Sequence, residues 1–271
     1  MKKNKELDKV LNTGDVLVVA FGAMIGWGWV VSSGGWIQDA GVIGTMIAFL
    51  IGGIMIYFVG LTYAELTTAM PESGGAKVFS QRAFGTVGSF ICTWAVILSY
   101  IGVVCFEACS LPTIIQYIFP GFLKGYLYTV AGFDIYFTWL IVAIAFSILI
   151  TYINIRGVKT AAVLQKILTI TIASVGIILI VVSALKGNSS NLQGQIFIGE
   201  NTKSIITNIL SVAIIAPFFL FGFDVIPQAA EEINVPLKKL GKLLILSITL
   251  AVAFYGLVVW AVGYGMNAVE I

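Results

Sequence analysis

The sequence predicts an all-α protein that crosses a membrane several times. Hydrophobic residues form 59% of its 271 residues, charged residues form only 10%, and the mean hydropathy is +1.02. A soluble domain of this length could not bury so much apolar surface. The apolar residues also lie in runs of about twenty or more, which is the length that a helix needs to cross a bilayer. We therefore expect a bundle of membrane-spanning helices.

Counting about twenty apolar residues per crossing predicts seven spans. The first span follows a lysine-rich start, but its apolar run is too long for a signal peptide and lacks a convincing cleavage site. We expect this span to be retained. The expected spans are residues 13–36, 41–68, 86–118, 135–153, 161–185, 204–226 and 243–265.

The basic residues indicate the orientation of the chain. Of the 15 Lys and Arg residues, only Lys124, Lys186 and Lys203 fall on the side opposite the N-terminus. Loops rich in Lys and Arg remain in the cytoplasm. The sequence therefore predicts a multi-pass protein of the plasma membrane with a cytoplasmic N-terminus. After an odd number of spans, the C-terminus would lie outside.

Three glycines interrupt the first expected span. Gly22, Gly26 and Gly28 lie within one apolar run, and each weakens a helix by roughly 1 kcal/mol relative to alanine. Interrupted backbone inside a bilayer is tolerated only where protein or a water-filled cavity satisfies its polar groups, and transporters bind their substrates at such interruptions. We therefore expect a non-helical stretch near residues 25–28 that holds a small polar solute.

The sixth expected span carries a second interruption. Pro217 removes a backbone donor, and Gly222 and Asp224 follow shortly after it. Two interruptions at the start of two halves of a chain are typical of inverted-repeat secondary transporters. For either segment alone, close packing of glycine against a neighbouring helix is the alternative. We expect the second non-helical stretch near residues 219–222, close in space to the first.

Three carboxylates, those of Glu65, Glu107 and Asp224, lie inside or near the apolar spans. Glu65 is close to the cytoplasmic end of the second span, where structural pairing with a basic residue of the loop is expected. A charged side chain at the bilayer centre costs about 2.5–3.5 kcal/mol on insertion scales, so each one requires a reason. Asp224 directly follows the second interruption, which favours a functional role over a structural hydrogen bond. Glu107 lies in the outer half of the third span. It could contact a substrate amine, hold a proton or extend toward the interface, and its position in the sequence does not decide between them.

The sequence offers no residues for catalysis. It contains no histidine, no nucleotide-binding loop and no pair of nucleophile and base, and its three cysteines fall in one apolar run without a disulfide or zinc spacing. The basic residues lie in loops and form no nucleic-acid footprint. We therefore expect no enzymatic activity, no catalytic residue, no cofactor, no metal site and no nucleic-acid partner.

Five motifs, in order along the chain, resemble the amino acid, polyamine and organocation permease superfamily. The match begins near Thr13 and continues to the C-terminus. Each motif is loose, but together they are specific. They are Gly22-Ala-Met-Ile-Gly-Trp-Gly28, Tyr63-Ala-Glu-Leu66, Pro71-Glu-Ser-Gly-Gly75, Asn154-Ile-Arg-Gly-Val-Lys159, and Gly222-Phe-Asp224 with Glu231-Glu-Ile-Asn-Val-Pro236.

The resemblance implies a leucine-transporter-like fold of five-plus-five inverted repeats that carries amino acids by alternating access, with a proton or sodium ion as a candidate co-substrate. It implies a cytoplasmic tail at 1–12, a first repeat at 13–185, an extracytoplasmic loop at 186–203 and an incomplete second repeat at 204–271. Because relatives have ten or more spans, we expect a chain truncated after its seventh span, without part of the scaffold around the site.

The resemblance also assigns roles to individual residues. Backbone N–H groups at a half-helix N-terminus favour an anion, so the backbone near Ile25, Gly26, Trp27 and Gly28 would receive a substrate carboxylate. Carbonyl groups near Phe218, Phe219 and Phe221 would receive the substrate ammonium group. Asp224 matches an acidic position that takes part in proton coupling in some relatives. Glu107 is added to the substrate site as a candidate contact for an amine.

Two positions depart from the pattern of the superfamily. Trp27 stands where a small residue is usual, which makes a standard amino acid pose less certain. Some proton-coupled relatives carry a lysine near the position of Ile172, which is apolar here. Two alternatives therefore stay open beside amino acid transport: an importer of polyamines or organic amines, and a non-transporting membrane sensor or truncated paralogue.

Overall fold

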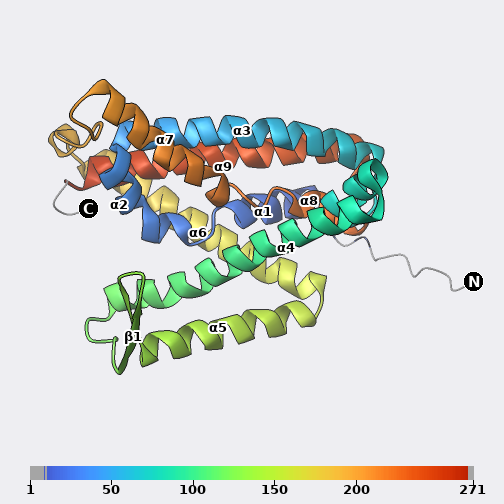
Figure 1. The fold of residues 1–271 in the computed structure, drawn as a ribbon, viewed down its shortest axis with the longest axis horizontal. Coiled ribbons are helices and arrows are strands. Elements are labelled where there is room, and N and C mark those ends of the chain that lie inside the picture. The colour runs from blue at the N-terminus through green and yellow to red at the C-terminus, as the bar shows by residue number, and fades with distance from the viewer. Residues whose placement is uncertain (1–8, 10, 268–271) are drawn as a thin grey trace, which may run out of the picture.

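A computed structural model describes Lys9 and residues 11–267, without the side chains of residues 158, 159, 237 and 238. Lys2, Lys3 and Lys5, which contributed to the predicted orientation, lie outside the described residues. Helices dominate the chain (Figure 1). The helices and strands are α1 (Thr13–Met24), α2 (Gly28–Ala40), α3 (Val42–Ala69), α4 (Ala76–Ile118), β1 (Tyr126–Val130), β2 (Phe133–Tyr136), α5 (Phe137–Ile155), α6 (Val158–Lys186), the 3₁₀ turn η1 (Ser189–Leu192), α7 (Thr202–Phe219), α8 (Val225–Gln228), the 3₁₀ turn η2 (Ala230–Glu232) and α9 (Leu237–Gly265).

The described helices agree with the expected number of spans. Six of them are long and apolar enough to cross a membrane, and the pair α1 and α2, bent by 44° at a short break, gives a seventh when counted as one span. Each of the seven expected spans coincides with one of these elements. The composition and the helices together support a multi-pass membrane protein.

The core of the molecule lies between α3, α7 and α9, with α1 and α6 packed against α9. In Figure 1, α3 and α9 run side by side along the long axis. Small residues on α3 permit the close approach of both α7 and α9: a Cβ atom at Gly52 would lie 2.7 Å from the side chain of Ala216 in α7, and one at Gly53 would lie 2.5 Å from Val252 in α9. Such small-residue contacts are the usual means by which membrane helices pack.

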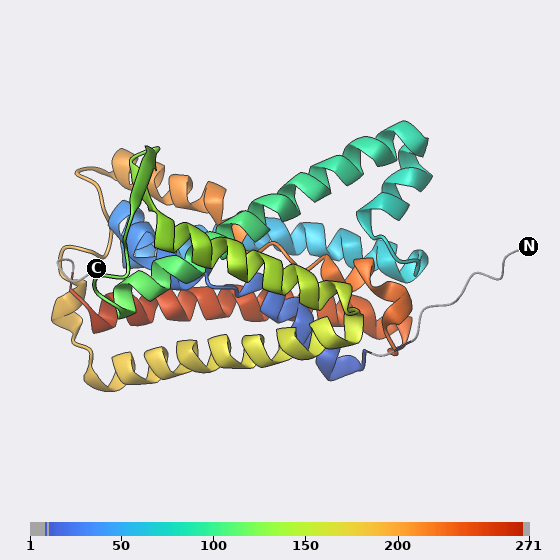
Figure 2. The same ribbon diagram turned by 90° about the horizontal axis from the view of Figure 1, so that it is seen from below.

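The helices α4 and α5 form an outer layer that packs mainly on itself. Figure 2 shows α4 crossing the bundle obliquely, with the kinked corner between its two segments standing away from the other helices. Only 6% of the most apolar stretch of α4 and of α5 is buried, compared with 50% for α9. Their side chains therefore present a broad apolar surface, which is compatible with contact with lipid.

Three boundaries differ from the expected ones by more than five residues. Helix α4 begins at Ala76 rather than at residue 86, because a further helical segment precedes Gly85, whose φ of +69° marks a kink that apolar counting treated as a loop. Helix α9 begins at Leu237 rather than at 243, because its first turn follows Pro236 and carries lysines. Helix α7 ends at Phe219, seven residues before the expected end of the sixth span.

A β-hairpin that the sequence did not predict connects α4 and α5. Strands β1 and β2 pair antiparallel, and the residues between them, Ala131 and Gly132, both have positive φ angles. Two such residues form the tight turn that joins twisted antiparallel strands. The hairpin is mostly exposed and lies away from both breaks.

Candidate functional site

The first break separates α1 from α2. Residues 25–27 are not helical, as expected, and the two helices meet at an angle of 44°. The N–H group of Ile25 still bonds to the carbonyl oxygen of Phe21, and the helical pattern resumes when the N–H group of Val30 donates to the carbonyl oxygen of Trp27. The first N–H groups of α2 have no partner within the helix and are therefore available to other groups.

Glu107, from α4, lies at the start of α2 and accepts a hydrogen bond there. Its Oε2 atom accepts a hydrogen bond of 3.1 Å from the backbone N–H of Trp27. A Cβ atom on Gly26 would collide with the carboxylate, so glycine at this position makes the contact sterically feasible. A protein carboxylate thus lies at the helix start to which the resemblance assigned a substrate carboxylate.

The second break follows α7. The chain turns through residues 220–224, as expected near residues 219–222, and then forms the short helix α8. Gly222 has a φ of +125°, which favours glycine, and a Cβ atom there would lie 2.8 Å from the backbone of Ala23 in α1. The two breaks therefore contact each other directly, as expected.

A tyrosine from α9 connects the two breaks. The Tyr255 hydroxyl lies 2.9 Å from the carbonyl oxygen of Met24 and 3.2 Å from that of Phe219, so its single hydrogen is shared between them. These carbonyl groups belong to the last residues of α1 and α7. Tyr255 is 1% exposed and stacks on Phe49. It was not predicted, although a tyrosine in an apolar span usually needs a partner for its hydroxyl.

Asp224 is buried behind the second break. Its Oδ1 atom accepts a hydrogen bond of 2.8 Å from the hydroxyl of Tyr100, and its Oδ2 atom accepts one of 2.6 Å from Nε2 of Gln228. Nε2 of Gln228 also donates to the Tyr100 hydroxyl oxygen at 3.1 Å. Both carboxylate oxygens therefore bond to neutral donors, and neither Tyr100 nor Gln228 had been predicted.

A cavity of about 20 Å³ lies between the breaks, which is room for about one water molecule. Of the residues predicted for the site, the structure brings Gly26, Gly28, Glu107, Phe218, Phe219 and Phe221 to this cavity. The side chain of Ile25 is buried elsewhere in the core, and Trp27 contributes its N–H group to Glu107 but does not line the cavity. The ring of Phe106, which was not predicted, closes the cavity on the α4 side.

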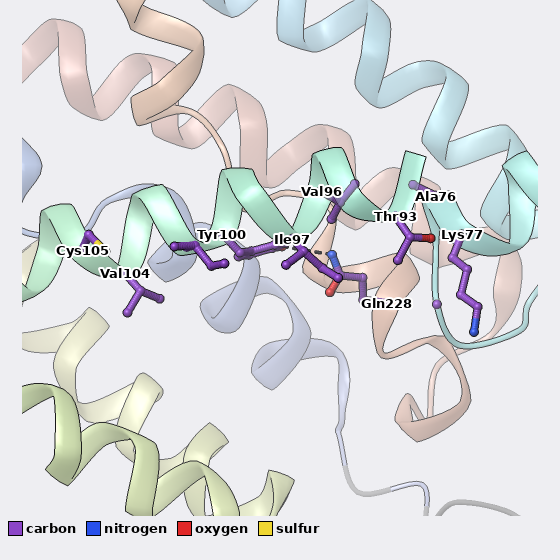
Figure 3. A pocket seen from close by; sticks show the side chains of 11 residues that line it. Ala76, Lys77, Thr93, Val96, Ile97, Tyr100, Val104, Cys105 and Gln228 are labelled. Atoms are coloured by element: carbon purple, nitrogen blue, oxygen red, sulfur yellow. Dashed lines mark hydrogen bonds between the residues drawn. The ribbon is translucent and has the colours of Figure 1, made fainter. Parts of the chain in front are cut away.

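A larger groove of about 520 Å³ runs along α4, from Lys77 to Cys105. Figure 3 shows the side chains that line it, with Tyr100 and Gln228 joined by their hydrogen bond near its middle. Most of its lining is apolar. The backbone segments that the resemblance assigns to the substrate lie at the smaller cavity, whereas Asp224, bonded to Tyr100 and Gln228 of the groove lining, connects the groove with the second break. Among the described residues, no group of three or more His, Cys, Asp or Glu side chains could hold a metal ion.

The family model for amino acid permeases matches residues 15–268. The chain belongs to the amino acid permease family. This family consists of permeases rather than enzymes. That the chain belongs to it agrees with the resemblance indicated by the five motifs. Together with the apolar helices, it supports a multi-pass membrane protein.

Curated relatives extend the comparison. The branched-chain amino acid permease BcaP of Bacillus subtilis (strain 168) is 28% identical over 93% of this chain and 54% of its own length. The aspartate-proton symporter of the same organism is 26% identical over 94% of this chain and 48% of its own. The lysine-specific permease LysP of Escherichia coli (strain K12) is 24% identical over 86% and 46%, respectively. The chain spans about half the length of these relatives.

Proposed function

We propose that this chain builds the substrate site of a secondary active transporter that moves amino acids across the plasma membrane by alternating access. The substrate would lie between the break of α1 and α2 and the break after α7. The N-terminus would lie in the cytoplasm, and the two breaks would belong to two inverted repeats of five spans, of which residues 204–271 contribute the start of the second.

One observation carries this proposal: the two breaks lie in contact and are joined by a single buried hydroxyl. Gly222 packs on the backbone of Ala23, and Tyr255 reaches the last carbonyl groups of both α1 and α7. Unpaired backbone groups inside a bilayer are tolerated where they line a ligand cavity. Because the cavity holds only about 20 Å³, binding of an amino acid requires the breaks to move apart, as alternating access demands.

The ion that drives transport is left open by the residues at the site. Asp224 matches an acidic position associated with proton coupling, and one relative is named an aspartate-proton symporter. We propose a proton or sodium ion as co-substrate, with Asp224 as the candidate coupling group. Its two neutral hydrogen-bond donors equally support a role in holding the second break in shape.

The test measures binding and uptake of the same labelled amino acids. The purified chain in lipid nanodiscs should bind a member of a panel of neutral, cationic and acidic amino acids, and Gly28→Val should abolish binding because its side chain would meet the rings of Phe219 and Phe106. Gly35→Val is the matched control, since a Cβ atom on Gly35, in the same helix, meets nothing within 4 Å. Equal affinity in the two variants would contradict the proposal.

Uptake into proteoliposomes separates the alternatives. Saturable uptake that Gly28→Val abolishes is the result expected of a transporter. Binding without uptake would favour the non-transporting sensor or truncated paralogue. An importer of polyamines or organic amines is the second candidate, because Glu107 lies at the break where it could contact an amine. Selective uptake of amines over amino acids would favour that candidate.

A further inference from the structure

We infer that the cavity between the two breaks selects substrates that carry a net positive charge, with Glu107 as the counter-charge that the protein supplies. The inference rests on the proposed function, because it concerns the same cavity. It narrows the substrate class to cationic amino acids and amines, in which ammonium groups outnumber carboxylates.

The first argument concerns the polar groups around the cavity. Helices α1 and α7 both end there, and their last carbonyl groups, those of Met24 and Phe219, point to the Tyr255 hydroxyl. Helix C-termini carry partial negative charge. The start of α2 would supply positive charge, but its Trp27 N–H is already bonded to Glu107. The backbone and Glu107 therefore give this site an excess of negative charge.

The second argument concerns the partner of Glu107. The ion pairs found among the described side chains join Arg82 to Glu72 and Lys166 to Asp15, and neither includes Glu107. Its one described hydrogen bond comes from the Trp27 N–H. A carboxylate withdrawn from water is stabilised chiefly by a nearby cation, and a carboxylate in a membrane-spanning segment usually has one. A cationic substrate would provide that partner.

The third argument concerns the aromatic rings beside the carboxylate. Phe106, Phe218 and Phe219 form a cluster in which the ring centroids are 5.3–5.7 Å apart, and all three line the cavity together with Glu107. Aromatic faces attract ammonium groups, most strongly where water is excluded. Rings and a carboxylate around one small cavity therefore form a suitable environment for an ammonium group.

A neutral amino acid fits this arrangement less well. Its carboxylate, like that of lysine, would compete with Glu107 for the Trp27 N–H group, but it has no side-chain ammonium group to offset the charge of two carboxylates in one small cavity. Like charges at short distance in a site of low polarity repel strongly. Lysine and norleucine provide a matched comparison, because their carbon chains have the same length and only lysine carries a terminal ammonium group.

The test measures the affinities of the chain in nanodiscs for lysine, norleucine and cadaverine, the diamine that lacks the carboxylate of lysine. We expect lysine and cadaverine to bind at least about tenfold more tightly than norleucine, as a close charge pair permits. In Glu107→Gln that preference should fall below about threefold, and Glu107→Asp, which retains the charge, should preserve most of it. Glu65→Gln is the control, because Glu65 is exposed on α3.

The outcomes distinguish this inference from the proposed function. If norleucine binds as tightly as lysine, the inferred selectivity for positive charge is wrong, but the proposed substrate site is not contradicted. If Glu107→Gln leaves the preference for lysine over norleucine unchanged, Glu107 is not the source of the selectivity, and the inference is overturned. If no member of the wider amino acid panel binds to a folded chain, the proposed function itself fails. Thermal unfolding of each variant verifies that it is folded.

Discussion

The two breaks interrupt their spans by different means. At the first break, a run of glycines lets the backbone bend by 44°, and Gly26 faces the end of a flexible side chain, that of Glu107. At the second break, Gly222 holds a positive φ angle and faces backbone atoms of α1. Backbone atoms cannot move aside as a side chain can. The difference indicates that the first break can adapt to a ligand, whereas the second acts as the fixed support.

The carboxylates at the two breaks differ in the same way. Both oxygens of Asp224 accept hydrogen bonds from side chains: one from Tyr100 in α4 and the other from Gln228, which lies four residues after Asp224. Glu107 has one described donor, a backbone N–H group across the cavity. A carboxylate with both oxygens satisfied resists rearrangement, while one held by a single bond can exchange partners. This comparison predicts that Asp224 maintains the shape of the site and that Glu107 responds to the substrate.

The largest effect should come from adding one methyl group at each break. Gly222→Ala forces an unfavourable φ angle and places Cβ 2.8 Å from the backbone of Ala23, so we expect a loss of about 3 kcal/mol in stability. Gly26→Ala should cost clearly less, because the Glu107 carboxylate can move away. Denaturation of both variants in the same detergent measures the difference. Equal losses would show that both breaks are equally rigid.

An intermediate effect should follow from neutralising each carboxylate. In Asp224→Asn, the amide nitrogen would face either Nε2 of Gln228 or the hydroxyl of Tyr100, so one of these two donors would lose its acceptor. We expect a loss of about 2 kcal/mol. Glu107→Gln should change stability by less than about 0.5 kcal/mol, because Gln can still accept from the Trp27 N–H group.

A second substitution tests the cause of the Asp224 effect. Gln228→Glu in the Asp224→Asn background offers an acceptor to the new amide and should restore at least half of the lost stability. The pH profile of uptake provides a further measurement, since a coupling role predicts that Asp224→Asn alters the profile, while a purely structural role lowers the rate. A double variant that is no more stable than Asp224→Asn would remove the hydrogen-bond explanation.

The sequence predicted the local features of the site well and the long-range ones poorly. Glycine and proline indicated both breaks, and the cost of a charge in an apolar span identified Glu107 and Asp224. Tyr100 and Tyr255 were missed because their partners Asp224 and Met24 lie 124 and 231 residues away in the chain, whereas Gln228 was missed although it lies only four residues after Asp224. A tyrosine in an apolar span indicates that its hydroxyl needs a partner, but not which carbonyl group will be close.

The same limit applies to the fold. Apolar length located every span, because crossing a bilayer depends on composition. It misplaced the start of α9, where lysines occupy the first helical turn after Pro236, and it gave no indication of the hairpin at 126–136. These features depend on backbone hydrogen bonds rather than on apolar content. The expectation that the breaks meet came from their positions at the start of two halves of the chain, which composition alone would not have provided.

A smaller loss of stability than at Gly222 or Asp224 should come from Tyr255, the side chain common to both breaks. Tyr255→Phe removes the hydroxyl from the carbonyl groups of Met24 and Phe219 but retains the ring that stacks on Phe49 at 4.8 Å. We expect a loss of about 1 kcal/mol, the usual contribution of one buried hydrogen bond. Tyr57→Phe is the control, since Tyr57 is 38% exposed on α3. Because the hydroxyl connects the adaptable break to the fixed one, Tyr255→Phe should also weaken substrate binding more than its effect on stability implies. If the affinity is unchanged while the stability falls, the hydroxyl supports the fold alone and the two breaks are not coupled through it.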